Sequence, residues 1–348
     1  MWHACGVPSC ETLERRREVD AHAADAELEA DPSFRRFKHE CTACLQQFER
    51  AQEWADLIRY LLRLQKVLSR YEHLPIIPEK VLFAKRLYQC LNPALPSGVH
   101  EKTLETIELI FARIGQRRLA RDLAFYSEGI FPLYRHASYQ VKPKLLDLFE
   151  RYYVPLGAFV VPCLPGLVLS LLSAMEDLGS EFYHRAVKLL DMLTESTPIH
   201  AIMGALWGRL LHNASVRYPA LAYLSMRFPV SSTLSNEATL TSTAAKAAST
   251  GRLAVTRAQF CPDATGSVLR ALLIALQQGD SLLRRTALEL LVTHFPLPRH
   301  YASLRDGHSV NAAVAPVART AATPALSHTP KLNVKHLYFI HGSIQALP

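Results

Sequence analysis

Glycine is scarce in this sequence: 14 of the 348 residues, about 4%, are glycine, against roughly 7% in an average protein. Nucleotide-binding α/β folds need glycine where the backbone approaches a phosphate. The sequence contains no G-x-x-x-x-G-K loop, no G-x-S-x-G or H-E-x-x-H pattern and no EF-hand loop. These absences argue against Rossmann and P-loop architectures and against the commonest hydrolase, metalloprotease and calcium-binding sites.

A disulfide framework and an apolar leader are also missing. The seven cysteines form an odd, scattered set, which is not typical of a disulfide-stabilised secreted protein. The first 31 residues contain no apolar run of signal-peptide length. We therefore expect reduced thiols and a cytosolic setting.

The charge of the chain is unbalanced, with 39 lysines and arginines against 31 acidic residues and a net charge of +8. A basic balance suggests anionic lipid headgroups, acidic protein segments or nucleic acid as partners. A solvated surface without a specific anionic ligand explains the same balance. Charge alone does not choose among these alternatives.

Apolar residues recur at three- and four-residue spacing from Phe34 onwards, which is typical of amphipathic helices. Gly115 is expected to end one of them, at about Val99–Ile114. No convincing alternation with a period of two is present, so no sheet is predicted. The spacing predicts helices near 34–48, 54–68, 79–90, 99–114, 117–127, 131–138, 142–153, 164–176, 180–194, 199–212, 215–227, 265–278 and 281–295.

Composition divides the chain into five parts, because polar and low-complexity stretches interrupt the helical pattern. The expected parts are a disordered N-terminal extension (1–32), a helical domain (33–229), a Ser/Thr/Ala-rich linker (230–262), a continuing helical repeat (263–298) and a largely irregular tail (299–348).

Two helical segments resemble each other at an offset of 67 residues: SVRYPALAYLSMRFP at 215–229 and LLRRTALELLVTHFP at 282–296. Arg217 aligns with Arg284, and each segment follows an apolar helix and a turn containing Asn or Asp. This arrangement is typical of HEAT-type repeats, in which each helix pair buries its apolar face against its neighbours. The predicted fold is therefore an all-α solenoid of HEAT/armadillo-like helical hairpins, with an irregular helical bundle as the alternative.

A run from Leu91 to His100, LNPALPSGVH, stands among stretches that resemble the N-terminal domain of the Dopey family. Other matching stretches are FERAQEWADLIRYLLRLQKVL at 48–68, VKPKLLDLFERYYVPLG at 141–157 and ALWGRLLHNASVRYPALAYL at 205–224. The resemblance covers about 34–229, and residues 265–296 are similar to the next segment of family members. The resemblance is lost after about Pro298, whereas members of the family continue for many hundreds of residues.

The resemblance implies a non-enzymatic scaffold in protein transport between endosomes and the Golgi. It implies a cytoplasmic protein, peripheral on Golgi, trans-Golgi network and endosome membranes. The implied partners are a large Mon-type scaffold related to Arf exchange factors and, in fungi, a phospholipid flippase. No cofactor, small-molecule substrate or catalytic residue is implied.

Four arginines, Arg113, Arg117, Arg118 and Arg121, surround Gly115 and form the candidate binding site. Guanidinium groups bind acidic lipid headgroups, such as phosphoinositides, or acidic segments of a partner. The alternative is a solvated helix end whose cations favour the nearby helix C-terminus. Direct binding of anionic lipid is thus a second possible function. Nucleic-acid binding is less favoured, because no recognised motif or strip of aromatic and basic residues is apparent.

Two other stretches resemble functional segments but are interpreted as parts of the core. His39, Cys41 and Cys44 form H-x-C-x-x-C, but zinc needs about four ligands, and two thiols one helical turn apart simply pack in a core. Residues 154–175 carry no charge and are long enough to span a membrane. Because three prolines interrupt this run, it is predicted to be a turn followed by a buried helix.

Overall fold

The computed structural model describes residues 25–227 and 266–294, and these residues form helices and turns without a strand. The predicted all-α class is confirmed. The predicted linker and C-terminal tail, and residues 1–24 of the N-terminal extension, lie outside the described residues. The rest of that extension contradicts the prediction of disorder, because residues 25–30 are helical. Asp31 then caps the next helix, its carboxylate accepting a hydrogen bond from the Ser33 amide at 2.7 Å.

Most helices lie within a few residues of their predicted positions. The helices are α2 (Pro32–Gln47), α3 (Trp54–Arg70), α4 (Lys80–Cys90), α5 (Ser97–Leu133), α6 (Val141–Leu148), α7 (Leu164–Ala174), α8 (Glu181–Ser196), α9 (Ile199–His212), α10 (Arg217–Arg227), α13 (Ser267–Gln277) and α14 (Ser281–His294). The short elements are η1 (Phe48–Arg50), η2 (Phe149–Tyr153), η3 (Val154–Cys163) and η4 (Ala214–Val216).

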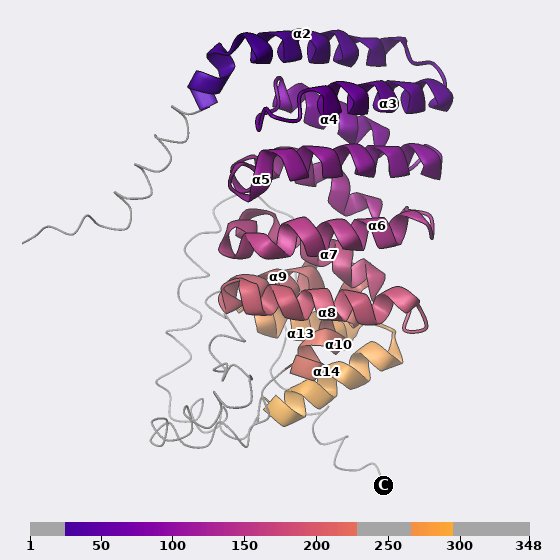
Figure 1. Cartoon of the computed structure of the whole chain (residues 1–348). Helices are drawn as coiled ribbons and strands as arrows, with labels where there is room; N and C mark the ends of the chain where they lie inside the picture. The colour runs from indigo at the N-terminus through magenta and orange to yellow at the C-terminus, as the bar shows by residue number, and fades with distance from the viewer. Residues whose placement is uncertain (1–24, 228–265, 295–348) are drawn as a thin grey trace, which may run out of the picture. The chain divides into compact units, whose positions relative to one another are not determined.

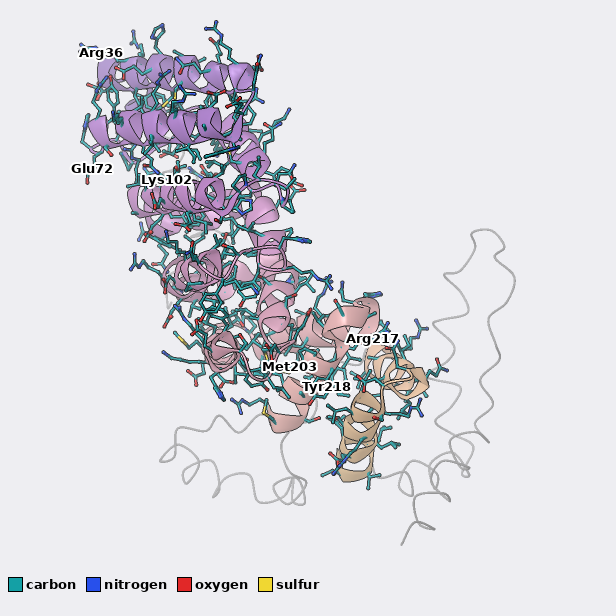
Figure 2. The ribbon with its side chains drawn as sticks, turned by 90° about the vertical axis from the view of Figure 1, so that its right-hand side faces the viewer. Arg36, Glu72, Lys102, Met203, Arg217 and Tyr218 are labelled. Atoms are coloured by element: carbon teal, nitrogen blue, oxygen red, sulfur yellow. The ribbon has the colours of Figure 1, made fainter. Side chains whose placement is uncertain are left out.

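The helices stack in two layers (Figures 1 and 2). The first layer contains α3, the half of α5 before Gly115, α6, α8 and α10. The second layer contains α4, the half of α5 after Gly115, α7, α9 and α13, and these helices contact one another in that order. From α3 onwards, with the two halves of α5 counted separately, successive described helices alternate between the layers, so each hairpin buries its apolar side against the next.

Charged side chains connect neighbouring helices of the first layer in one repeated direction. Acidic residues of one helix pair with basic residues of the next helix along the stack. Exposed pairs of this kind contribute at most about 1 kcal/mol each, so they help to define the stacking order more than they add stability. The pairs are Glu101–Lys144, Glu108–Arg151, Asp147–Arg185, Glu150–Lys188 and Asp191–Arg227.

The two segments of the predicted repeat play the same structural part. Arg217, labelled in Figure 2, donates to the Leu210 carbonyl near the end of α9 at 3.1 Å. Arg284 donates to the Gln278 carbonyl at the end of α13 at 2.6 Å. The last carbonyls of a helix have no partner within it, so each arginine completes the end of the preceding helix. Buried positions also coincide at the offset of 67: Val216 and Leu283, Ala220 and Ala287, and Tyr223 and Leu290.

The helix boundaries predicted after Gly115 differ from those in the structure. Gly115 has φ 70° and ψ 171° and interrupts α5 where the sequence predicts a helix end. The separate helices predicted near 117–127 and 131–138 are wrong, because one helix continues to Leu133. Gly129 lies inside this helix, and a Cβ there would be 2.5 Å from Cδ2 of Tyr88. The glycine therefore permits close approach of α4 and does not break the helix.

The uncharged run at 154–175 folds into turns and a core helix. Within the described residues, Val141–Ala174 is the one helical stretch long and apolar enough to cross a membrane. Gly157, with φ 57° and ψ −127°, interrupts it. α7 packs against α5, α8 and α9, and its Leu167 and Leu171 are fully buried. This packing favours the predicted turn and buried helix over a membrane span.

Candidate partner-binding surface on α4 and α5

The structure removes Arg113 from the predicted arginine cluster. Arg113 belongs to the half of α5 before Gly115, and its guanidinium group lies 5.2 Å from the centre of the Phe37 ring. It also donates a hydrogen bond to the Leu68 carbonyl. Burial lowers the pKa of Arg113. This side chain joins α2, α3 and α5 and offers little to an external ligand.

Arg118 and Arg121 share one carboxylate, that of Asp25. Arg118 Nε lies 2.9 Å from Oδ1, and Arg121 Nη2 lies 2.6 Å from Oδ2. The Asp25 side chain is only 14% exposed. Burial by itself raises the pKa of Asp25, but the hydrogen bonds and charges of the two arginines outweigh it and hold this pKa below its usual range. The helical segment before α2 is thus attached to α5 by charge.

Arg117 lies on the same half of α5 and is exposed. Among the residues that the structure describes, it has no hydrogen-bond or ion-pair partner. The structure therefore brings together three of the four predicted arginines and adds Asp25. Sequence reasoning missed Asp25 because it assigned the acidic run DAELEAD to a disordered extension.

Helix α4 lies beside these arginines in the second layer. Lys80 Nζ is 2.6 Å from Asp122 Oδ1 and 5.4 Å from the centre of the Phe125 ring. Arg121 Nε is 3.7 Å from the same Asp122 oxygen. Asp122 is a buried carboxylate whose charge Lys80 and Arg121 compensate. These contacts link the arginines of α5 to the basic residues of α4.

Three large apolar side chains are exposed on α4 and the second half of α5: Val81 (59%), Tyr88 (55%) and Phe125 (43%). Lys85 is exposed between Val81 and Tyr88 on the same face of α4, since residues four and seven apart share a helix face. The sequence showed no strip of aromatic and basic residues along one helix, but the structure brings such residues of two helices together into one surface at the Lys80–Phe125 contact. We call it the α4–α5 surface, made of Lys80, Val81, Lys85, Tyr88, Arg117, Arg118, Arg121 and Phe125.

The H-x-C-x-x-C sequence does not converge on one point. Cys41 and Cys44 are buried, whereas His39 is exposed. Burial raises the pKa of both thiols, that of Cys44 to about 11. Across residues 25–227 and 266–294, no three His, Cys, Asp or Glu side chains are placed to hold a metal ion. The two thiols pack as core side chains of α2.

We expect acid to release residues 25–30 from α5. The folded-state pKa of Asp25 lies below its unfolded value, so the contact stabilises the attached segment above about pH 4 and is lost as pH falls through the folded pKa. Hydrogen-exchange protection factors, corrected for intrinsic rates, should fall for residues 25–30 below pH 4 while those of α9 persist. Asp25→Asn should lower protection of the segment already at pH 7; equal protection in both proteins would contradict the attachment.

Comparison with known proteins identifies a family that the chain matches. A family model described as "Dopey, N-terminal" matches residues 31–321. The chain is 42% identical over 200 residues to Protein DOP1B of Xenopus laevis, covering 58% of this chain and 9% of that protein. It is 37% identical over 270 residues to Protein pad-1 of Caenorhabditis elegans, covering 77% and 10%.

It is also 31% identical over 206 residues to Protein DOP1 of Saccharomyces cerevisiae, covering 57% of this chain and 12% of that protein. The matched region spans about a tenth of the length of these curated relatives. None of the three names is that of an enzyme. No solved structure matches the chain.

Proposed function

The chain belongs to the Dopey family, and from this premise we propose that it is part of a non-enzymatic scaffold for protein transport between endosomes and the Golgi. It acts at the cytosolic face of Golgi, trans-Golgi network and endosome membranes through protein–protein contacts. Its partners are a large Mon-type scaffold related to Arf exchange factors and, as a second partner, a phospholipid flippase.

The family match across residues 31–321 carries this proposal. The two-layered stack supports it, because helical-repeat arrays present extended surfaces that are held rigid by packing between neighbours. The α4–α5 surface supports a binding role as well, since exposed aromatic side chains beside arginines are enriched in protein interfaces. A scaffold needs surfaces of this kind and no reacting groups.

Proximity labelling tests the proposal directly. The full chain fused to a biotin ligase should label the Mon-type scaffold several-fold more strongly than the same ligase anchored to Golgi membranes alone. It should also collect on Golgi and endosome membranes. Equal labelling by the chain and by the anchored ligase would contradict the proposed partner, and an even cytosolic distribution would contradict the proposed location.

Direct binding of anionic lipid is the second candidate function, and one observation favours it. Phe159 of η3 is 69% exposed. The neighbouring Pro155 carbonyl accepts a hydrogen bond from Gln116, which precedes the exposed Arg117. The exposed aromatic side chain and the exposed arginine thus belong to segments that contact each other, and both suit a peripheral contact with an anionic membrane. Sedimentation with phosphoinositide-containing vesicles measures this binding.

A further inference from the structure

We infer that the α4–α5 surface binds an acidic, amphipathic helical segment of another protein, and that the chain's own residues 25–30 occupy the edge of this surface when that partner is absent. The inference rests on the proposed scaffold function in one respect, that the occupant is a protein. Three properties of the surface lead to it: its charge, its exposed apolar side chains and the acidic segment already attached to it.

The charge of the surface selects an acidic occupant. The surface has five basic residues, whereas α4 and the second half of α5 contain only two acidic ones, Asp122 and Glu128. Asp122 is paired with Lys80 and offsets only that charge, so an excess of positive charge remains. Lys85 and Arg117 are exposed and, within the described part of the chain, have no ion-pair partner. Such an imbalance steers negatively charged partners towards the surface.

The apolar side chains require an occupant with an apolar face. Val81, Tyr88 and Phe125 are each more than 40% exposed, although large apolar side chains such as these are mostly buried in folded proteins. Gly129 allows α4 and α5 to approach closely beside Tyr88, so the aromatic side chain is presented by a firmly packed helix pair. Rigid aromatic side chains surrounded by charge are typical anchors of protein interfaces. An inorganic anion would leave this apolar area uncovered.

The chain itself attaches an acidic helical segment to the edge of the surface through Asp25. Residues 25–31 read DAELEAD, with four acidic residues in seven, and residues 25–30 are helical. Asp25 contacts Arg118 and Arg121 across 93 and 96 residues of sequence. Glu27 and Glu29 remain exposed, and so do Lys85 and Tyr88 further along the surface. The segment therefore covers only part of the site.

Attachment within the same chain makes the segment a competitor. A tethered segment acts at an effective concentration in the millimolar range, so a partner in solution must displace it. Removing the Asp25 carboxylate should therefore strengthen binding of an external acidic helix, although it removes an interaction from the chain. Substitutions in Lys85 or Tyr88 should weaken the same binding, because an external helix also covers the part that residues 25–30 leave open.

Fluorescence polarisation with purified full chain tests these expectations. The probe is a labelled peptide of about 20 residues, which forms a helix roughly 30 Å long. It has leucine on one helical face and glutamate on the other. Its control has the same composition with the leucines dispersed. We expect Asp25→Ala to bind the probe about tenfold more tightly than the unchanged chain. Adding Lys85→Glu or Tyr88→Ala to Asp25→Ala should lower the affinity about tenfold.

Lys188→Glu is the matched control, because Lys188 is an exposed lysine of the first layer. Added to Asp25→Ala, it should leave the affinity unchanged, and circular dichroism should show all variants folded. Equal affinity of the unchanged chain and Asp25→Ala would overturn the inference. So would equal binding of the amphipathic and dispersed peptides.

Phosphatidylserine vesicles and single-stranded oligothymidylate complete the test. If Lys85→Glu and Tyr88→Ala weaken vesicle or oligonucleotide binding as strongly as peptide binding, the surface is a general anion site and the inference is wrong. The measurement uses purified components only. A failure to label the Mon-type scaffold in cells therefore leaves the peptide result intact, and a failed peptide experiment leaves the labelling result intact.

Discussion

Replacing Phe111 by alanine is expected to lower the free energy of unfolding by about 3–5 kcal/mol. Phe111 is 1% exposed, and its ring packs edge-on against Tyr126, Tyr152 and Tyr153 at centroid distances of 5.6, 5.5 and 6.1 Å. Each such aromatic pair adds roughly 0.5–1.5 kcal/mol beyond the burial of apolar area. The partners belong to the second half of α5 and to η2, so the ring joins the two layers of the stack.

Leu109→Ala is the control for this substitution. Leu109 lies on the same helix only two residues away, but it is 41% exposed. Its truncation should change the free energy of unfolding by less than about 0.5 kcal/mol. Chemical denaturation followed by circular dichroism measures both values. A loss for Phe111→Ala no larger than that for Leu109→Ala would show that the aromatic cluster does not hold the layers together.

Periodicity predicted the helices well because it reports on a local requirement. A helix that packs on one side needs apolar residues at three- and four-residue spacing wherever it lies in the fold. The repeat was also visible in the sequence for a local reason. Arg217 and Arg284 each reach back to the end of the helix just before their own, which needs only a short turn.

Gly115 and Gly129 show what periodicity does not reveal. Both look like helix breakers, but only Gly115 adopts a positive φ. Gly129 keeps the helix intact, because its missing Cβ makes room for Tyr88, 41 positions earlier in the sequence. The role of a glycine in a helix thus depends on a neighbour that the local sequence does not identify.

The candidate site was predicted only in part for the same reason. The arginines around Gly115 are equivalent in sequence, but Phe37 and the Leu68 carbonyl draw Arg113 inwards, and Asp25 pairs with Arg118 and Arg121. Each of these partners lies at least 45 residues away. The aromatic half of the α4–α5 surface likewise arises only when two helices of the second layer meet. Tertiary contacts, and not the spacing of charges, decide which arginines face a partner.

Replacing Gly115 by alanine is expected to lower the free energy of unfolding by about 1–3 kcal/mol. The backbone at Gly115 has φ 70° and ψ 171°, a region that residues with a Cβ essentially do not occupy. Beyond the adjacent residues and the nearby backbone of the helix, no atom lies within 4 Å of a Cβ placed there, so the cost comes mainly from the backbone conformation. Alanine favours a continuous helix through this position, which would carry the second half of α5 out of the second layer.

Gly204→Ala is the matched control, and the sign of its effect should be opposite. Gly204 is an exposed residue inside α9, and a Cβ there also meets nothing within 4 Å. Because glycine in a helix interior is less favourable than alanine by roughly 0.5–1 kcal/mol, this substitution should stabilise the chain. Thermal and chemical denaturation of the two variants therefore separate a strained turn from an ordinary helical glycine. The backbone turn at Gly115 directs the chain from the first layer to the second and thereby positions Arg117, Arg118 and Arg121. Stabilisation by both substitutions would mean that Gly115 does not have this role.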